Sequence, residues 1–135
     1  MLPIFLDTET TGNQPTDRLC QLSYKKPDDT YDSMFDELFK PPLPITIEAM
    51  AVHHITEKMV ADKPGFQDSP LFPAIKDLLE DPENVVVAHN APFDIDMLNR
   101  DEVFPANFID TLKLVRHFDP EMKIARHNLQ YLRYL

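Results

Sequence analysis

The sequence predicts an α/β fold, because strand-like and helical segments alternate along its 135 residues. Three observations carry this prediction. A short apolar run opens the chain, so residues 2–7 are expected to form a strand. Two more strand-like segments, residues 18–25 and 31–39, flank a turn-rich stretch and suit an antiparallel hairpin. The second half of the chain then repeats a strand followed by a helix.

The helices are placed by apolar periodicity and by residues that begin helices. An extended connector containing three prolines, residues 41–44, precedes two short helices that are expected at residues 45–53 and 56–61. Ser69 can cap a further helix that has a proline at its first position and continues to Glu80.

The two strand–helix repeats complete the plan. A β-branched run predicts a strand at residues 85–88, and a helix is expected at residues 92–101. A shorter strand is expected at residues 107–109, before a helix over residues 111–118 that Asp110 can cap.

The length of 135 residues indicates one domain with a real core, residues 1–135, and an apolar fraction of 43% is ordinary for a globular protein. No apolar run approaches the roughly 20 residues of a membrane span, and no secretory signal precedes the first strand. The single cysteine, Cys20, cannot form an internal disulfide, so a cytoplasmic location is expected. Its apolar neighbours predict that Cys20 is a small core residue.

The net charge of −10 argues against a protein that grips duplex DNA, because such proteins show a basic footprint. Here 13 basic residues face 23 acidic ones, and no basic stripe is obvious. The charge is compatible with a protein that contacts only a few phosphates.

Two carboxylates, Asp7 and Glu9, follow the first apolar run. In a strand, residues two apart point to the same face, so these acids would lie side by side. Like charges repel there unless a cation lies between them, and oxygen ligands favour Mg²⁺ or Mn²⁺. The alternative is a solvated pair of acids at a strand end, before a Thr-Gly turn.

A third carboxylate, Asp94, follows the strand at residues 85–88. Pro92 suits the first turn of the next helix, where Asp94 lies near the positive end of the helix dipole. The alternative is that Asp94 is only a favourable charge there and Asn90 only its cap. Because both strands end in acids, we expect Asp7, Glu9 and Asp94 to converge at one edge of the sheet.

These two segments resemble a known family. Residues 7–12 resemble the first motif of the DEDD 3′→5′ exonucleases, and residues 89–94 resemble the second. The most similar subgroup of this family is typified by the proofreading epsilon subunit of bacterial DNA polymerase III. Residues 44–56 resemble the segment after its third strand, and residues 109–112 resemble its Asp-Thr junction between a strand and a helix. The resemblance implies a ribonuclease H-like fold, in which helices flank a mixed five-stranded sheet.

The resemblance also implies a mechanism, the hydrolysis of phosphodiesters with two bound Mg²⁺ or Mn²⁺ ions. Asp7 would bridge both ions, Glu9 would serve the first, and Asp94 would hold the second through water. The implied substrate is the 3′ end of single-stranded DNA or RNA, and a DNA polymerase is a possible partner.

Further residues could contact the substrate, and each also has a structural explanation. The threonines suit strand ends and turns, the histidines could be structural, and the aromatic ring could belong to the core. These candidates are Thr8, Thr10, Thr11, His53, His89, Asn90 and Phe93.

The family's third motif, a His followed five residues later by an Asp, is absent from these residues. No acidic residue follows Glu121, and neither His117 nor His127 has an Asp five residues on. Residues 1–135 are therefore expected to be an exonuclease domain that is incomplete at the C-terminus, with low activity. An apolar groove is expected beside Leu129, Leu132 and Leu135, which would invite a homodimer or a partner helix.

Two other functions stay open. One is a module of the same fold that binds a nucleic-acid end or a protein without cutting. The other is a metal-dependent phosphatase or nucleotide hydrolase that uses Asp7 and Glu9.

Overall fold

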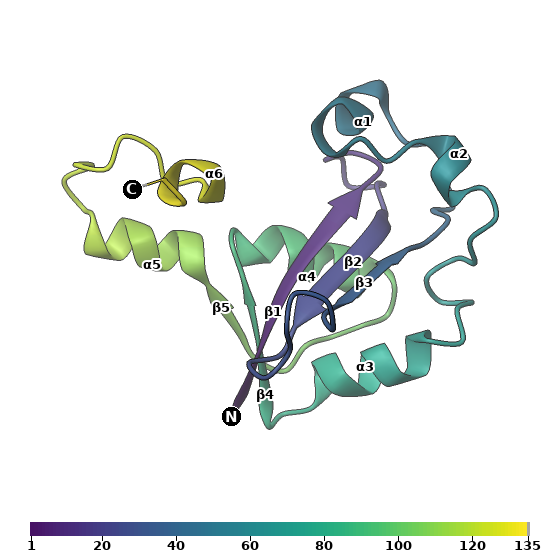
Figure 1. Ribbon diagram of the computed structural model, residues 1–135, viewed down its shortest axis with the longest axis horizontal. Helices are drawn as coiled ribbons and strands as arrows, with labels where there is room; N and C mark the ends of the chain where they lie inside the picture. Colours follow the sequence, from purple (N-terminus) through teal and green to yellow (C-terminus); the bar gives the residue numbers. More distant parts are fainter. Residues whose placement is uncertain (135) are drawn as a thin grey trace.

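A mixed sheet of five strands forms the centre of the molecule (Figure 1). The computed structural model describes residues 1–134; for residues 130 and 131 the description covers the backbone only. The strands are β1 (Leu2–Thr10), β2 (Leu19–Lys25), β3 (Phe35–Leu38), β4 (Asn84–Ala88) and β5 (Phe108–Asp110). Their order is β3-β2-β1-β4-β5, with β1, β2 and β3 antiparallel and with β4 parallel to both β1 and β5. The predicted mixed sheet and its hairpin are confirmed.

Six helices lie around this sheet in the described part of the chain. They are α1 (Ile47–His53), α2 (Glu57–Val60), α3 (Phe72–Glu80), α4 (Ala91–Arg100), α5 (Thr111–Phe118) and α6 (Leu129–Leu132). In Figure 1, α5 and α6 lie on the left, apart from the other helices. None of the described helices is both long and apolar enough to cross a membrane.

One face of the sheet carries the main core. Ile4 and Leu6 of β1 are buried there beside Val86 of β4. Helices α3 and α4 cover this face through Ile75, Leu79 and Leu98. Because side chains alternate along a strand, the other face of β1 carries Phe5, Asp7 and Glu9. We call this second face of the sheet the open face, since Phe5 is 46% exposed on it.

A bulge between β1 and β2 lets two successive residues be buried. Glu9 lies opposite Gln21, but Thr10 lies opposite Leu19, so Cys20 has no partner in the register. Leu19 then joins the main core, while Cys20 packs in a second cluster of buried residues with Ile45, Ile55 and Val60. The prediction that Cys20 is a core residue is confirmed, and burial raises the pKa of its thiol to about 12.

Most predicted elements differ from the structure by a few residues at an end; β1, predicted to end at Asp7, continues to Thr10. Two of the differences have a visible cause. The strand predicted at residues 31–39 begins at Phe35, because the amides of Ser33 and Met34 donate to the carbonyl of Thr30 in a turn. The helix predicted from Ser69 begins at Phe72. Ser69 is instead part of a local turn, in which its hydroxyl accepts a hydrogen bond from the Leu71 amide at 3.1 Å.

Candidate active site

Asp7 and Glu9 lie on the open face of β1, two residues apart. Asp7 is an exposed residue, but the protein around its carboxyl group partly removes it from water, and this desolvation raises its pKa. A hydrogen bond from the Thr8 backbone lowers the pKa by a smaller amount. Burial also raises the pKa of Glu9, and the charge of Asp7 raises it further, while His53 lowers it. The two carboxylates therefore oppose each other's ionisation, and a cation between them would relieve that repulsion.

Asp94 reaches the same region from the first turn of α4. It is only 3% exposed, and its Oδ1 accepts hydrogen bonds from the Thr8 amide at 3.1 Å and the Thr8 hydroxyl at 2.7 Å. Burial raises the pKa of Asp94 to about 6, partly offset by the Thr8 hydroxyl, and the charge of Asp7 adds to the rise. Asp7 thus acts electrostatically on both other acids.

Asp7 is close enough to Glu9 and Asp94 to affect their pKa values, but the three carboxylates are not arranged as a set of metal ligands. In the part of the chain that the structure describes, no three His, Cys, Asp or Glu side chains are grouped so that they could hold a metal ion. One physical reason is that Oδ1 of Asp94 is directed to Thr8. The donor chemistry nevertheless fits Mg²⁺ or Mn²⁺, because all three acids offer only oxygen. Metal binding by Asp7, Glu9 and Asp94 stays a prediction.

The three threonine hydroxyls are all used within the protein. Thr8 binds Asp94, Thr10 donates to the Gly12 carbonyl at 2.7 Å, and Thr11 donates to Oδ1 of Asp17 at 2.6 Å. These bonds hold the backbone that carries Asp7 and Glu9. Whether the same threonines contact a nucleotide stays a prediction.

A cavity of about 290 Å³ adjoins Glu9, close to the lower size limit of small-molecule sites. Four of the predicted substrate residues line it, namely Thr8, Thr10, His53 and Phe93. Sequence reasoning missed the rest of the wall, to which Asn13, Thr46, Glu48, Ala49 and Val52 contribute. These side chains come from a turn and from α1 with its cap; residues 44–56 resemble a family segment, but only His53 was singled out there as a site residue.

Both ring nitrogens of His53 are occupied by backbone groups. Nδ1 accepts a hydrogen bond from the Ile55 amide at 3.0 Å, so Nε2 carries the proton and donates to the Thr10 carbonyl at 2.9 Å. His53 therefore fixes the end of β1 against α1, and it presents its ring to the cavity wall.

His89 and Asn90 lie elsewhere, at the junction of β4 with the C-terminal residues. The His89 ring nitrogens lie 2.9 Å from the Thr111 hydroxyl and 2.6 Å from the His127 carbonyl. Asn90 occupies the N-cap position of α4 with a left-handed backbone, but its side chain makes no capping hydrogen bond. Asp110 accepts hydrogen bonds from the Asn90 amide at 2.9 Å and the Leu112 amide at 3.0 Å, so its predicted role as a cap is confirmed.

A second cavity, of about 330 Å³, lies beside Asp7 and is lined by His89, Thr111, Leu129 and residues of β1 and β2. His89 and His53 therefore line different cavities, one beside Asp7 and one beside Glu9.

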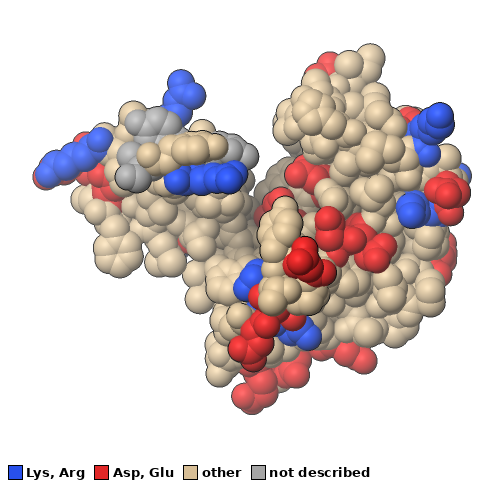
Figure 2. Space-filling model, viewed as in Figure 1, with Lys and Arg blue, Asp and Glu red and all other residues tan. Residues whose placement is uncertain are grey.

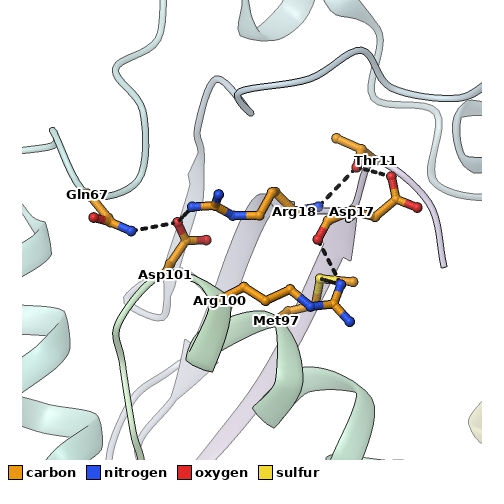
Figure 3. Close-up of polar contacts among 7 residues, drawn as sticks. All are labelled: Thr11, Asp17, Arg18, Gln67, Met97, Arg100 and Asp101. Atoms are coloured by element: carbon orange, nitrogen blue, oxygen red, sulfur yellow. Dashed lines mark hydrogen bonds and ion pairs between the residues drawn. The ribbon is translucent and has the colours of Figure 1, made fainter. Parts of the chain in front are cut away.

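The turn between β1 and β2 is built on a buried acid (Figure 3). Asp17 is 4% exposed, and besides Thr11 it accepts a hydrogen bond from the Gln14 amide at 2.7 Å. A Cβ at position 12 would lie 2.5 Å from Oδ2 of Asp17, so only Gly12 fits there. The turn that follows Asp7 and Glu9 thus has one compact conformation.

Two arginines fasten this turn to α4, the helix that carries Asp94 (Figure 3). Arg100 donates to the carbonyls of Gln14 at 3.1 Å and Asp17 at 2.8 Å. Arg18 pairs with Asp101, which also accepts a hydrogen bond from Gln67. Sequence reasoning missed this network, because each arginine lies more than 80 residues from its partners along the chain.

We expect Arg100→Ala to lower the free energy of unfolding by on the order of 1 kcal/mol, because a half-exposed cation loses two carbonyl acceptors. Urea unfolding measures the loss. Lys76→Ala is the matched control for lost cation contacts, since Lys76 pairs with Glu80 and does not contact the turn. Mn²⁺ affinity should fall in the Arg100 variant and stay unchanged in the control. Equal affinities in both variants would contradict a link between this turn and the acids.

The comparisons with known proteins agree with this geometry. The family model RNase_T, described as an exonuclease, matches residues 4–134. Exodeoxyribonuclease 10 of Escherichia coli (strain K12) is 39% identical over 98 residues, which are 73% of this chain and 40% of that relative. DNA polymerase III subunit epsilon of Buchnera aphidicola subsp. Acyrthosiphon pisum is 30% identical over 138 residues, covering 89% of this chain and 56% of the relative. The chain therefore spans about half of these relatives or less.

Solved structures give the same result. Exonuclease X in complex with 5′ overhanging duplex DNA matches with a TM-score of 0.68 and 33% identity, over 98% of this chain and 74% of that one. E. coli exonuclease I in complex with a dA16 oligonucleotide has a TM-score of 0.72 at 19% identity, over 90% of this chain and 30% of that one, and it supports the fold alone. Enzymes of this family generally use divalent metal ions. The chain belongs to the RNase_T family of DEDD exonucleases and has their ribonuclease H-like fold.

Proposed function

We propose that this domain is a metal-dependent 3′→5′ exonuclease acting on the 3′ end of single-stranded DNA or RNA. The observation that carries the proposal is the position of three acids: the charge of Asp7 acts on both Glu9 and Asp94, and Glu9 lines a cavity of about 290 Å³. The relatives named above are exonucleases or a polymerase subunit, and the structure of exonuclease X contains 5′ overhanging duplex DNA.

The residues divide into groups that hold metal and groups that hold substrate. Asp7, Glu9 and Asp94 would bind Mg²⁺ or Mn²⁺, which prepares the attacking water and stabilises the leaving oxygen when bound. Asp94 ionises near neutral pH because its pKa is about 6, so it is available as a ligand there. Phe93 forms one wall of the cavity and offers a ring on which the terminal base can stack.

The direction of cutting tests the proposal. Protein in excess over a 5′-labelled single-stranded oligonucleotide, in Mn²⁺, should produce a ladder that shortens from the 3′ end. Glu9→Gln should abolish the ladder, because one charged ligand is lost. Cleavage of free nucleotides without a ladder would favour a phosphatase or nucleotide hydrolase instead. Mn²⁺-dependent binding without any cutting would favour a binding module.

Metal binding is expected to be weak and to depend on Asp7. Calorimetric titration with Mn²⁺ should show a site whose affinity falls at least about tenfold in Asp7→Ala, since a carboxylate ligand is removed from an all-oxygen set. Glu83→Ala is the control, because Glu83 is exposed and precedes Asn84, which pairs with Leu2 at the other end of β1. Tight binding that survives Asp7→Ala would place the metal at another site.

Two partners belong to this proposal. A DNA polymerase is one, by analogy with the epsilon subunits among the relatives. A second copy of the chain is the other, since Leu129 is 59% exposed and lines the cavity beside Asp7. The predicted groove also involved Leu132, whereas Leu135 lies outside the described residues. Sedimentation of the pure chain distinguishes monomer from dimer.

A further inference from the structure

The charge of this protein is divided sharply along the chain. Five of its 13 Lys and Arg residues, but only two of its 23 Asp and Glu residues, come after residue 110. The five basic residues are Lys113, Arg116, Lys123, Arg126 and Arg133. We call residues 111–134 the C-terminal arm. In Figure 2 the coloured side chains over the arm on the left are mainly blue, whereas those over the body on the right are mainly red with some blue among them. The whole-chain charge of −10 conceals this basic surface.

Helix α5 presents the basic residues on one side. Arg116 and His117 follow Lys113 by three and four residues, so both lie on the same helix face as Lys113, and all three are exposed. Leu114 and Phe118 lie on a different face and are 44% and 80% exposed. No residue of α5 is buried, so both faces are accessible.

The arm is nevertheless a folded structure that is attached beside the acids. Asp119 is buried and accepts hydrogen bonds from the amides of Lys123 and Ile124, both at 2.9 Å, and from the His127 ring at 2.8 Å. His127 in turn binds His89 through its carbonyl at 2.6 Å. The cavity of about 330 Å³ beside Asp7 is lined both by Asp7 and by Thr111 of the arm. The arm therefore begins at the open face, next to the candidate metal site.

We propose that the C-terminal arm binds the phosphate backbone of a single-stranded nucleic acid whose 3′ end lies at Asp7 and Glu9. This inference rests on the proposed function. A cluster of acids repels a polyanion, and cations set beside the cluster offset that repulsion. Phe118, which is 80% exposed next to the basic face, provides a stacking platform for a base upstream of the end.

Substitutions in the arm distinguish binding by the arm from binding at the metal site alone. Lys113 and Arg116 should each neutralise about one phosphate, and each contact contributes about −0.7 to the slope of log affinity against log salt for single strands. The double variant Lys113→Ala, Arg116→Ala should therefore reduce that slope by about 1.4. Its affinity should fall about tenfold at low salt. Phe118→Ala should weaken binding about fivefold or more, with an unchanged slope.

The experiment is fluorescence anisotropy of a labelled dT20 oligonucleotide with the full chain, in EDTA to prevent cutting, over a series of NaCl concentrations. The matched control is Lys58→Ala, Lys63→Ala, which removes two exposed lysines from the region of α2 on the body. We expect the control to bind like the unmodified chain. Sedimentation and thermal melting of each variant show whether it remains folded and in the same oligomeric state.

Several results would overturn the inference. They are an unchanged slope and affinity in the arm variant, an equal loss in the control, or loss of a dimer rather than of nucleic-acid binding. The proposed function can fail independently. Glu9→Gln should keep the arm-dependent affinity while losing the ladder. Arm-dependent binding by a chain that never forms a ladder would overturn the exonuclease proposal and leave this one standing.

Discussion

Asp94→Asn is expected to stabilise the folded protein by up to about 3 kcal/mol near pH 7.5, while weakening Mn²⁺ binding. The pKa of Asp94 is about 6 in the folded state, against an ordinary value of about 3.9, because burial penalises the charged form. Each unit of difference corresponds to about 1.4 kcal/mol. An amide pays no such penalty, and its oxygen can still accept the hydrogen bonds from Thr8.

The sign of the pH dependence follows from the same difference. Between about pH 4 and pH 6 the folded state keeps the Asp94 proton longer than the unfolded state does. The contribution of Asp94 to stability is therefore complete below pH 4 and is lost as the pH rises through 6. Urea unfolding at several pH values should show that Asp94→Asn gains on the unmodified protein across this window.

The matched control for this prediction is Asp96→Asn, because Asp96 is exposed on the same helix. It should leave the pH dependence unchanged. An Asp94→Asn variant that is no more stable at pH 7.5 than at pH 4, relative to the unmodified protein, would show that burial of this carboxyl is not costly. If Asp94→Asn both stabilises the protein and weakens Mn²⁺ binding, then the Asp94 carboxylate lowers stability but serves metal binding.

The 135 residues by themselves should degrade a single-stranded oligonucleotide slowly or undetectably in Mg²⁺ under multiple turnover. The third motif of the family is a histidine followed five residues later by an aspartate, and neither His117 nor His127 is followed in this way. By resemblance to the family, the missing His would be the general base, and a general base alone contributes a factor of roughly 10²–10⁴ to the rate. E. coli exodeoxyribonuclease 10, assayed beside the chain, provides the reference rate.

An ordinary rate that disappears on Glu9→Ala would contradict this prediction, because another group would then act as the base. His89 is poorly suited to that role, since its ring nitrogens contact Thr111 and the His127 carbonyl. His117 is exposed on α5, so His117→Ala would be the next variant to assay.

The sequence was sufficient for features that depend on neighbours along the chain. Period-two alternation put Asp7 and Glu9 on one face of β1, and an acid before a helix predicted the cap at Asp110. The limits of α5 were predicted to the residue, because a cap begins it and its apolar spacing is regular. The motifs identified the family from local residue order alone.

Only the tertiary structure decided which distant groups meet. Asp94 binds Thr8 across 86 positions, and Arg100 reaches the turn at Asp17 across 83. The bulge at Cys20 and the bond between His89 and His127 likewise depend on elements packing together. The physical reason is range. Strand alternation and helix caps act over a few residues, whereas the burial that raises the pKa of Asp94 and the position of the basic arm beside Asp7 exist only once the chain has folded.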